Sequence, residues 1–357
     1  VTTDSPIIVG VTSGPNNLDP RIGTDDVSQK IGQLVFTNLM RLDDQLRVVP
    51  GLAERLEATS PVTYVATLRR GVRFHDGHEL TSADVVHTFR SFLDPAFVSA
   101  RKGAYRMLQS VDASDRYTVV FTLKEPFGSF PVNLVMPVVP ATADAQFRDH
   151  PVGTGPYRFV ESVSDDHVTL TRFDGYFEAP ARNTGVVLRV VPDDIMRGLE
   201  LRKGSIDLVV NDIAPDIVHQ LEQDPALQVV RGPGTDYQYV GLNLRDPILS
   251  DVRVRLALGY AIDRQSIVDH LRRGLAIPAI GVLPPMSWAF DDRVFTFRYD
   301  PVRARQLLDE AGYRDPDGEG PQPRFHLSLK VSNNEFNRLQ SSVLQQNLAA
   351  VGIALDV

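Results

Sequence analysis

The sequence predicts an α/β fold with more than one domain, and three observations support this. A strand at Val186–Val191, a helix at Asp194–Lys203 that ends at Gly204, and a strand at Ile206–Val210 form a βαβ unit, which calls for a parallel pair. The chain has 357 residues, enough for two or three domains. Its hydrophobic fraction of 43% is ordinary for a folded protein with a sizeable core.

Composition excludes several classes of protein and of site. The net charge of −8 disfavours a nucleic-acid binder. The absence of cysteine excludes disulfides, thiolate metal sites and cysteine nucleophiles. No run approaches the roughly 18 apolar residues of a membrane span. The first residues, VTTDSPIIVGV, lack the basic and apolar regions of a signal peptide.

In the first part of the chain, alternation and helical spacing predict the elements. A strand at Ile7–Val11 precedes a polar loop, and a helix follows from about Ser28 to Met40. Further alternating stretches predict strands at Tyr64–Leu68, Thr118–Leu123 and Val168–Phe173.

The stretch from Leu68 to Phe89 combines a strand end, a tight turn and a helix start. Asp76-Gly77 suits a two-residue turn, because glycine accepts a positive φ. Thr81 precedes Asp84 by three residues, which is typical of a capping box at a helix start.

In the last part of the chain, capping residues mark the helices. A strand is expected at Tyr237–Asn243 and a helix after Asp251. The remaining expected elements are a helix from Asp263 to Gly274, a helix from Asp300-Pro301 to Gly312, a strand at Phe325–Val331, a helix from about Asn334 to Ala350, and a strand at Ile353–Val357.

Motifs spread over the whole chain carry a family resemblance. The stretch LRRGVRFHDGHELTSADVVHTF resembles the signature region of the family 5 solute-binding proteins of ABC importers, the oligopeptide, dipeptide and nickel binders. Matches in family order are Leu18–Pro20, Pro50–Glu54, Gly153–Tyr157, Gly204–Asp207, Asp251–Arg255, Ala261–Arg264 and Leu307–Tyr313.

The resemblance implies a fold like the type II periplasmic binding proteins, with two lobes and an extra subdomain of the kind called cluster C. Lobe I is expected at residues 1–39 and 149–235, the extra α+β subdomain at 40–148, and lobe II at 236–357. Members of the family continue past this point, so lobe II is expected to be incomplete here.

The resemblance also implies a function. We expect an exported, monomeric and non-catalytic receptor without a cofactor. It would capture peptides in an interlobe cleft by hinge motion and deliver them to a membrane permease. A nickel, metallophore or other small-solute receptor of the same family is the alternative, and a hydrolase is a third possibility without positive support.

Three groups of residues are candidates for ligand contact. The resemblance places the loop with Gly23, Thr24, Asp25 and Asp26 at the cleft, whereas the simpler interpretation is a surface loop before a helix. The segment Asp236, Tyr237, Gln238 and Tyr239 resembles the family's hinge segment and can hold an extended ligand, although tyrosine is also favoured inside sheets. Trp288, the only tryptophan, either lines the cleft or packs within its loop.

The densest histidine and carboxylate cluster, which contains His75, Asp76, His78, Glu79 and His87, raises the question of a metal site. His75 and His78 flank a turn, and no HExxH or similar spacing is present. We therefore expect these residues to be structural, with no metal bound. The sequence also contains no Gly-x-Ser-x-Gly elbow and no recognisable acid/base pair, so no catalytic residue is predicted.

Overall fold

The computed structural model of the chain describes residues 4–318, 320–332 and 335–357. The chain consists of two compact units. Unit 1 contains Val1–Ile213 with Asp224–Leu227, and unit 2 contains Ala214–Gln223 with Gln228–Val357. The described residues form three hydrophobic cores, two in unit 1 and one in unit 2. The predicted domain boundaries after residues 39, 148 and 235 stay predictions.

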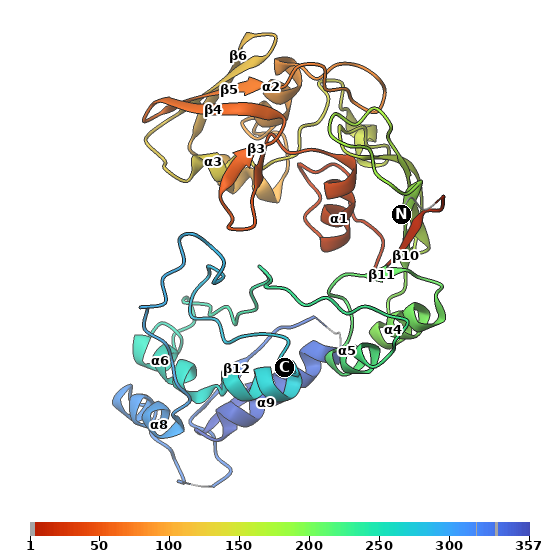
Figure 1. Cartoon of the computed structure of the whole chain (residues 1–357). Coiled ribbons are helices and arrows are strands. Elements are labelled where there is room, and N and C mark those ends of the chain that lie inside the picture. Colours follow the sequence, from red (N-terminus) through yellow and green to blue (C-terminus); the bar gives the residue numbers. More distant parts are fainter. Residues whose placement is uncertain (1–3, 319, 333–334) are drawn as a thin grey trace. The chain divides into compact units, whose positions relative to one another are not determined.

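Unit 1 is built from strands and short helices (Figure 1). Its strands are β1 (Ile7–Val11), β2 (Met40–Leu42), β3 (Val48–Pro50), β4 (Ala53–Ser60), β5 (Thr63–Leu68), β6 (Leu108–Asp115), β7 (Thr118–Leu123), β8 (Tyr157–Val163), β9 (His167–Arg172), β10 (Gly185–Val190) and β11 (Leu208–Val209). Its helices are α1 (Asp26–Val35), α2 (Ser82–Ser91), α3 (Phe130–Asn133) and α4 (Asp194–Lys203), with the 3₁₀ turns η1 (Ala100–Tyr105) and η2 (Ala145–Arg148).

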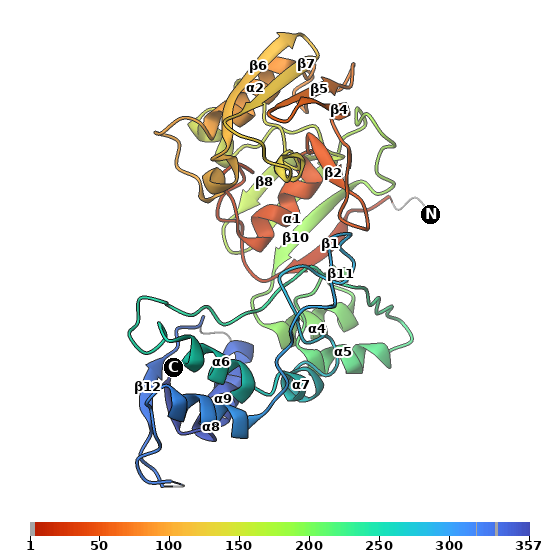
Figure 2. The same ribbon diagram turned by 90° about the vertical axis from the view of Figure 1, so that its left-hand side faces the viewer.

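A mixed five-stranded sheet, of order β11-β1-β10-β9-β8, forms one half of unit 1. β1 is parallel to both neighbours, since Val9 pairs with Leu188 of β10 and with Leu208 of β11. The predicted parallel relation between the strands that flank α4 is therefore present, but β1 lies between them. α1 lies against this sheet and shares its core (Figure 2).

An antiparallel sheet of order β4-β5-β7-β6, with α2 beside it, forms the other half. The predicted strands β5 and β7 are confirmed within one residue, and their alternate side chains are buried. Phe89 of α2 packs edge-on against Phe121 of β7, with ring centroids 5.1 Å apart. Strand pairing and aromatic packing together give this half its own core.

The first predicted helix is shorter than expected. It was predicted to reach Met40, but α1 ends at Val35 and Phe36 is extended. The physical reason lies in the partners of the next residues, because the backbone N–H groups of Leu39 and Met40 donate to the carbonyls of Met136 and Leu134. Leu39 is therefore apolar because it is buried in the core of the antiparallel sheet, and not because the helix continues to it.

The predicted turn and helix start around residues 76–84 are confirmed. Gly77 has φ of +95°, and its N–H donates to the carbonyl of Phe74. The Asp84 carboxylate accepts from the Thr81 N–H at 2.8 Å, as a capping box requires. Local sequence was sufficient to predict both features.

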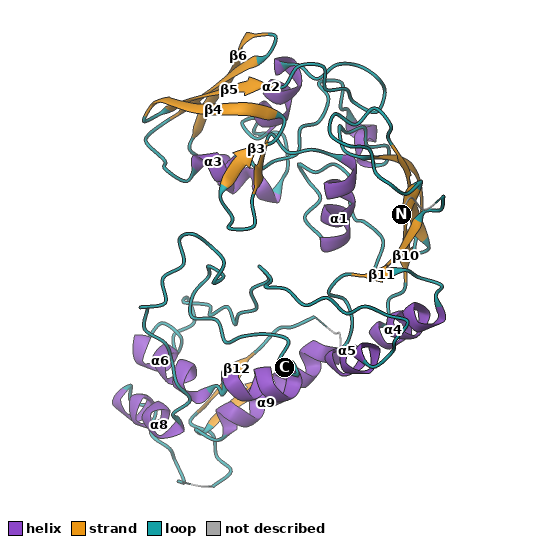
Figure 3. Cartoon of the chain, in the orientation of Figure 1, coloured by secondary structure: helices purple, strands orange, loops and turns teal. Residues whose placement is uncertain are grey.

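Unit 2 is built mainly from helices and long loops (Figure 3). Its elements are α5 (Pro215–Glu222), α6 (Val252–Ala261), α7 (Arg264–Ser266) continued by the π-helical turn η3 (Ile267–Leu271), α8 (Pro301–Glu310), β12 (Phe325–Ser328), α9 (Glu335–Ala349) and β13 (Ile353–Asp356). The predicted caps Asp251, Asp263 and Asp300 each accept a backbone N–H at the start of a helix. No helix of the described residues combines the length and apolar character needed to span a bilayer.

Two predictions for unit 2 differ from the structure. The expected strand at Tyr237–Asn243 is a loop, and the described strands of unit 2, β12 and β13, pair with each other and not with this segment. The expected strand Phe325–Val331 ends at Ser328, because its partner β13 ends at Asp356, which pairs with Ser328. Asn334, the expected start of the last helix, lies outside the described residues.

His75 joins three separate parts of unit 1. Its ring Nδ1 accepts from the Gly153 N–H at 3.2 Å, so the proton lies on Nε2, which donates to the Gly155 carbonyl at 3.0 Å. The Gly155 N–H in turn donates to Val35 at the end of α1. Burial lowers the pKa of His75 to about 4, so the imidazole is neutral at physiological pH.

This neutral, buried histidine makes the stability of unit 1 dependent on pH. The unfolded chain takes up a proton at His75 between pH 6.5 and 4 that the folded chain does not. The free energy of unfolding should therefore fall as the pH falls through this window, with a contribution from His75 of about 3 kcal/mol at pH 4. Urea unfolding at several pH values measures this change in the free energy of unfolding.

A matched pair of variants isolates the histidine. His75→Gln should lower stability at pH 7 and flatten the pH dependence between 6.5 and 4. Thr37→Val removes a neighbouring hydrogen bond to the Thr154 carbonyl without removing a titrating group, so it should lower stability and keep the slope. An unchanged slope in His75→Gln would contradict the assignment.

Candidate functional site

The loop before α1 carries the first group of predicted contact residues. The N–H groups of Ile22 and Gly23 both donate to the Asp19 carbonyl, which closes a tight turn after Leu18-Asp19-Pro20. A side chain at Gly23 would place its Cβ 2.1 Å from the Asn17 carbonyl oxygen, so only glycine fits. Asp25 caps α1 by accepting from the Ser28 N–H. The sequence therefore holds this loop in one backbone conformation.

Contacts with the segment around η1 use part of the loop's hydrogen-bonding capacity. Ser99 Oγ donates to the Arg21 carbonyl at 2.6 Å, and Arg101 Nη2 donates to the Gly23 carbonyl at 3.1 Å. Both backbone groups of Gly23 are thus occupied within the chain. The side chains of Thr24 and Asp26 remain exposed, although Asp26 also pairs with Lys30 at 2.6 Å.

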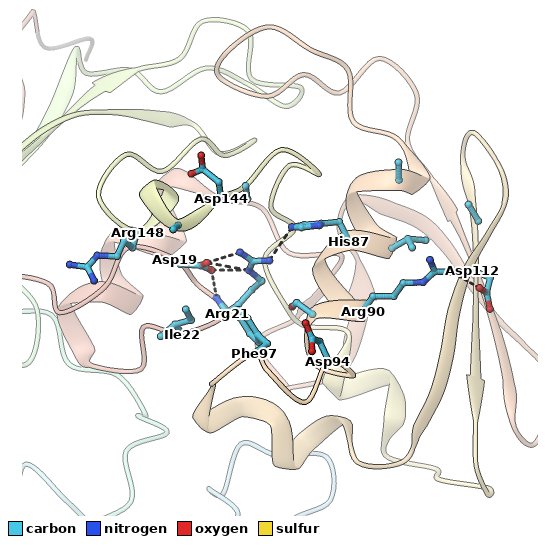
Figure 4. A pocket seen from close by; sticks show the side chains of 16 residues that line it. Asp19, Arg21, Ile22, His87, Arg90, Asp94, Phe97, Asp112, Asp144 and Arg148 are labelled. Carbon is cyan, nitrogen blue, oxygen red and sulfur yellow. Dashed lines mark hydrogen bonds and ion pairs between the residues drawn. The ribbon is translucent and has the colours of Figure 1, made fainter.

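A buried ion pair supports the loop from behind. Arg21 Nη2 lies 2.7 Å from Asp19 Oδ2, and both side chains are about 95% buried, since 5% and 4% of their surface is exposed. Arg21 Nη1 lies 3.1 Å from His87 Nε2 (Figure 4). Burial, and then the charge of Arg21, lower the pKa of His87, so its neutral ring accepts this hydrogen bond.

The same ion pair borders a hollow of about 1040 Å³ on unit 1. Figure 4 shows that its charged side chains come from several elements. Arg21, Arg90 and Arg148 each have a carboxylate partner, which is Asp19, Asp112 and Asp149 respectively. The charges that face this hollow are therefore largely compensated within the chain.

The second group of predicted residues lies in the long loop between α5 and α6 (Figure 3). The rings of Tyr237 and Tyr239 stack with centroids 5.7 Å apart, and 42% and 71% of their surfaces are exposed. Within the part of the chain that the structure describes, the backbone groups of residues 229–242 have no hydrogen-bond partner. This segment presents free N–H and carbonyl groups beside two aromatic rings.

Arg272 is a residue of this region that the sequence analysis did not single out. Its Nη2 donates to Gln238 Oε1, and its guanidinium lies 3.8 Å from the ring centroid of Phe336. The Arg-Arg-Gly sequence at a helix end is a weak signal, because arginine there also suits a helix C-terminus. Only the structure shows that Arg272 adjoins the predicted segment.

Trp288 lies apart from these contacts in a turn. The Ser287 N–H donates to the Pro284 carbonyl, and 69% of the indole surface is exposed. Among the described residues, no ring contact joins Trp288 with Tyr237 or Tyr239. Its role in ligand binding stays a prediction.

The histidine cluster is held by intrachain bonds. Both ring nitrogens of His75 are engaged by backbone groups, and His78 Nδ1 lies 2.6 Å from Asp76 Oδ1. His87 is hydrogen-bonded to Arg21. In the ranges that the structure describes, no group of three histidine or carboxylate side chains is arranged to hold a metal ion.

Comparison with known proteins gives consistent matches. The family model for bacterial extracellular solute-binding proteins, family 5, matches residues 47–357. The chain is 31% identical over 370 residues to the oligopeptide-binding protein AppA of Bacillus subtilis, an alignment that covers 97% of this chain and 67% of AppA. It is 32% identical over 361 residues to the glutathione-binding protein GsiB of Escherichia coli O157:H7, with 98% and 69% covered.

Solved structures agree. AppA in complex with a nonapeptide matches with a TM-score of 0.87 and 29% identity, covering 99% of this chain and 74% of AppA. NikZ of Campylobacter jejuni in complex with Ni(L-His) matches with a TM-score of 0.86 and 25% identity, covering 99% and 73%.

The buried ion pair behind the loop should be important for the folding of unit 1. Arg21→Met leaves the buried Asp19 carboxylate without its partner, so we expect the free energy of unfolding to fall by about 3–5 kcal/mol in urea unfolding. Arg47→Met removes the partner of Asp43 at the surface and should change stability little. Equal effects of the two substitutions would contradict the structural role of Arg21.

Proposed function

The chain belongs to the bacterial extracellular solute-binding proteins of family 5, and we propose that it captures peptides and delivers them to the membrane permease of an ABC importer. The family predicted from the sequence motifs is thereby confirmed, and the mixed α/β fold matches those of the solved relatives. In this proposal the chain acts outside the cytoplasm, binds as a monomer and releases its solute unchanged.

One observation in the chain itself carries the peptide assignment. Residues 229–242 lie outside any helix or strand. Their backbone groups have no hydrogen-bond partner within the described ranges. A peptide is the solute that offers a complementary row of N–H and carbonyl groups, as strand addition requires. The stacked Tyr237 and Tyr239 add apolar surface that tolerates different peptide side chains.

The relatives support the same solute class. AppA is an oligopeptide-binding protein seen with a nonapeptide, and GsiB is named for glutathione, itself a tripeptide. In our proposal, Gly23–Asp26 of unit 1 and Asp236–Tyr239 of unit 2 are among the residues that contact the peptide, with Trp288 as a further candidate. The match to NikZ, which was solved with Ni(L-His), supports a nickel complex as the alternative cargo.

Ligand-dependent thermal unfolding of the full chain tests the proposal. A pooled library of two- to nine-residue peptides should raise the free energy of unfolding, by about 2.7 kcal/mol at a hundredfold excess over Kd. Peptides should be recovered intact by mass spectrometry, because no turnover is proposed. A shift with nickel and L-histidine but not with peptides would contradict peptide capture and favour the alternative cargo.

The two tyrosines give a sharper test by substitution. Replacing both Tyr237 and Tyr239 by alanine should weaken peptide affinity by about 1–2 kcal/mol, roughly tenfold in Kd, in isothermal titration calorimetry. Thermal stability should change little, because Tyr239 is largely exposed and Tyr237 is about half exposed. Tyr299→Ala removes another exposed tyrosine of unit 2 and should keep the affinity of the wild-type chain. Unchanged affinity in the double variant would show that the rings do not contact the peptide.

A further inference from the structure

His87 connects α2 with the loop that precedes α1. Its ring Nε2 lies 3.1 Å from Arg21 Nη1, a contact between residues 66 positions apart in the chain (Figure 4). Arginine only donates hydrogen bonds, so the imidazole accepts at Nε2 and carries its proton on Nδ1. The contact therefore requires a neutral His87.

A second proton on the ring of His87 would turn this contact from attractive to repulsive. Both nitrogens would then be donors, and two cations would face each other at 3.1 Å in a half-buried place. Arg21 cannot relieve the repulsion, because a guanidinium stays protonated in proteins. The protonation state of His87 thus decides whether the hydrogen bond exists.

The charged groups around His87 act in both directions. Burial, and then the charge of Arg21, lower its pKa, whereas the carboxylates of Asp19 and Asp84 raise it, and the net direction is below the ordinary value of 6.5. The pKa returns toward 6.5 when the bond to Arg21 is absent, so acid favours the state in which this bond is broken. The other charged side chains that line the same hollow are Arg90, Asp94, Asp112, Asp144 and Arg148.

Arg21 transmits the contact to the backbone of the loop. Its Nε and Nη2 donate to the Asp19 carboxylate. The Asp19 carbonyl in turn accepts from the N–H groups of Ile22 and Gly23. Through these bonds, His87 supports the turn that leads into residues 23–26.

The contacts of this turn with the segment around η1 do not respond to pH near neutrality. Ser99 Oγ donates to the Arg21 carbonyl, and Arg101 Nη2 donates to the Gly23 carbonyl. A hydroxyl and a guanidinium keep their protonation state over this range. Acid therefore removes one support of the turn and leaves the others, which predicts a local loosening.

We propose that His87, acting through Arg21, is a positioning residue and a proton-sensitive switch for the loop of residues 19–26, so that acid loosens this loop and weakens the binding of solute. The loosening follows from contacts within unit 1 alone. Its effect on binding rests on the proposed peptide capture, in which Gly23–Asp26 contact the peptide.

Amide hydrogen exchange of the full chain at pH 7 and pH 5 tests the switch without any ligand. The N–H groups of Ile22 and Gly23 report on the turn, because both are bonded within it. After correction for the intrinsic pH dependence of exchange, their protection should fall about tenfold from pH 7 to pH 5. Amides of β7, which lies inside the antiparallel sheet, are the reference for a chain that stays folded.

Three variants assign the fall in protection to one residue. His87→Gln offers a carbonyl oxygen that accepts from Arg21 and does not titrate, so protection should be equal at the two pH values. His87→Ala removes the acceptor and should give the low protection at both. His78→Gln removes another histidine close to Asp84 and should keep the wild-type response. Equal protection of the wild-type chain at pH 7 and pH 5, or a fall that persists in His87→Gln, would overturn the proposal.

The effect on solute is measured with the pooled peptide library at the same two pH values. The rise in thermal stability with the library should be smaller at pH 5 than at pH 7 in the wild-type chain, and equal in His87→Gln. An equal rise in the wild-type chain would overturn the link between the loop and binding. No rise at pH 7 would count against peptide capture, whereas the exchange of Ile22 and Gly23 would still decide whether His87 is the switch.

Discussion

The hydrogen bonds of His75 are the constraint on which the arrangement of unit 1 depends. A single neutral imidazole accepts from Gly153 and donates to Gly155, so a turn in one half of the unit is bound to the segment that leads into β8. The packing at this point is close, because a Cβ at Gly153 would lie 2.0 Å from the Val35 carbonyl oxygen, so only glycine fits there.

The position of the loop before α1 follows from this constraint. The Gly155 N–H bonds the carbonyl of Val35, the last residue of α1, and Lys30 on the same helix lies 2.7 Å from Asp212 beyond β11. The far end of α1 carries the Asp25 cap and the loop of residues 23–26. A short helix held at its end and along its side places that loop reproducibly, which a binding contact needs.

Features set by local sequence could be predicted, and features set by distant partners could not. The predicted bounds of α4 are confirmed, because Gly204, with φ of +75°, ends the helix as its sequence predicts; the structure adds Asp193 as the cap at its start. The end of α1 was missed because pairing of residues 39–40 with residues 134–136 overrides the helical spacing. In the candidate site, Tyr237 and Tyr239 were chosen from sequence, whereas Arg272 emerges only from its contact with Gln238, 34 residues away.

Selectivity within this family must come from side chains and not from the fold. Structures with TM-scores of 0.86 and 0.87 to this chain hold a nickel–histidine complex in one case and a nonapeptide in the other. Ordinary ion pairs are poor candidates for such a role, since Arg21 and Arg90 already have partners within unit 1.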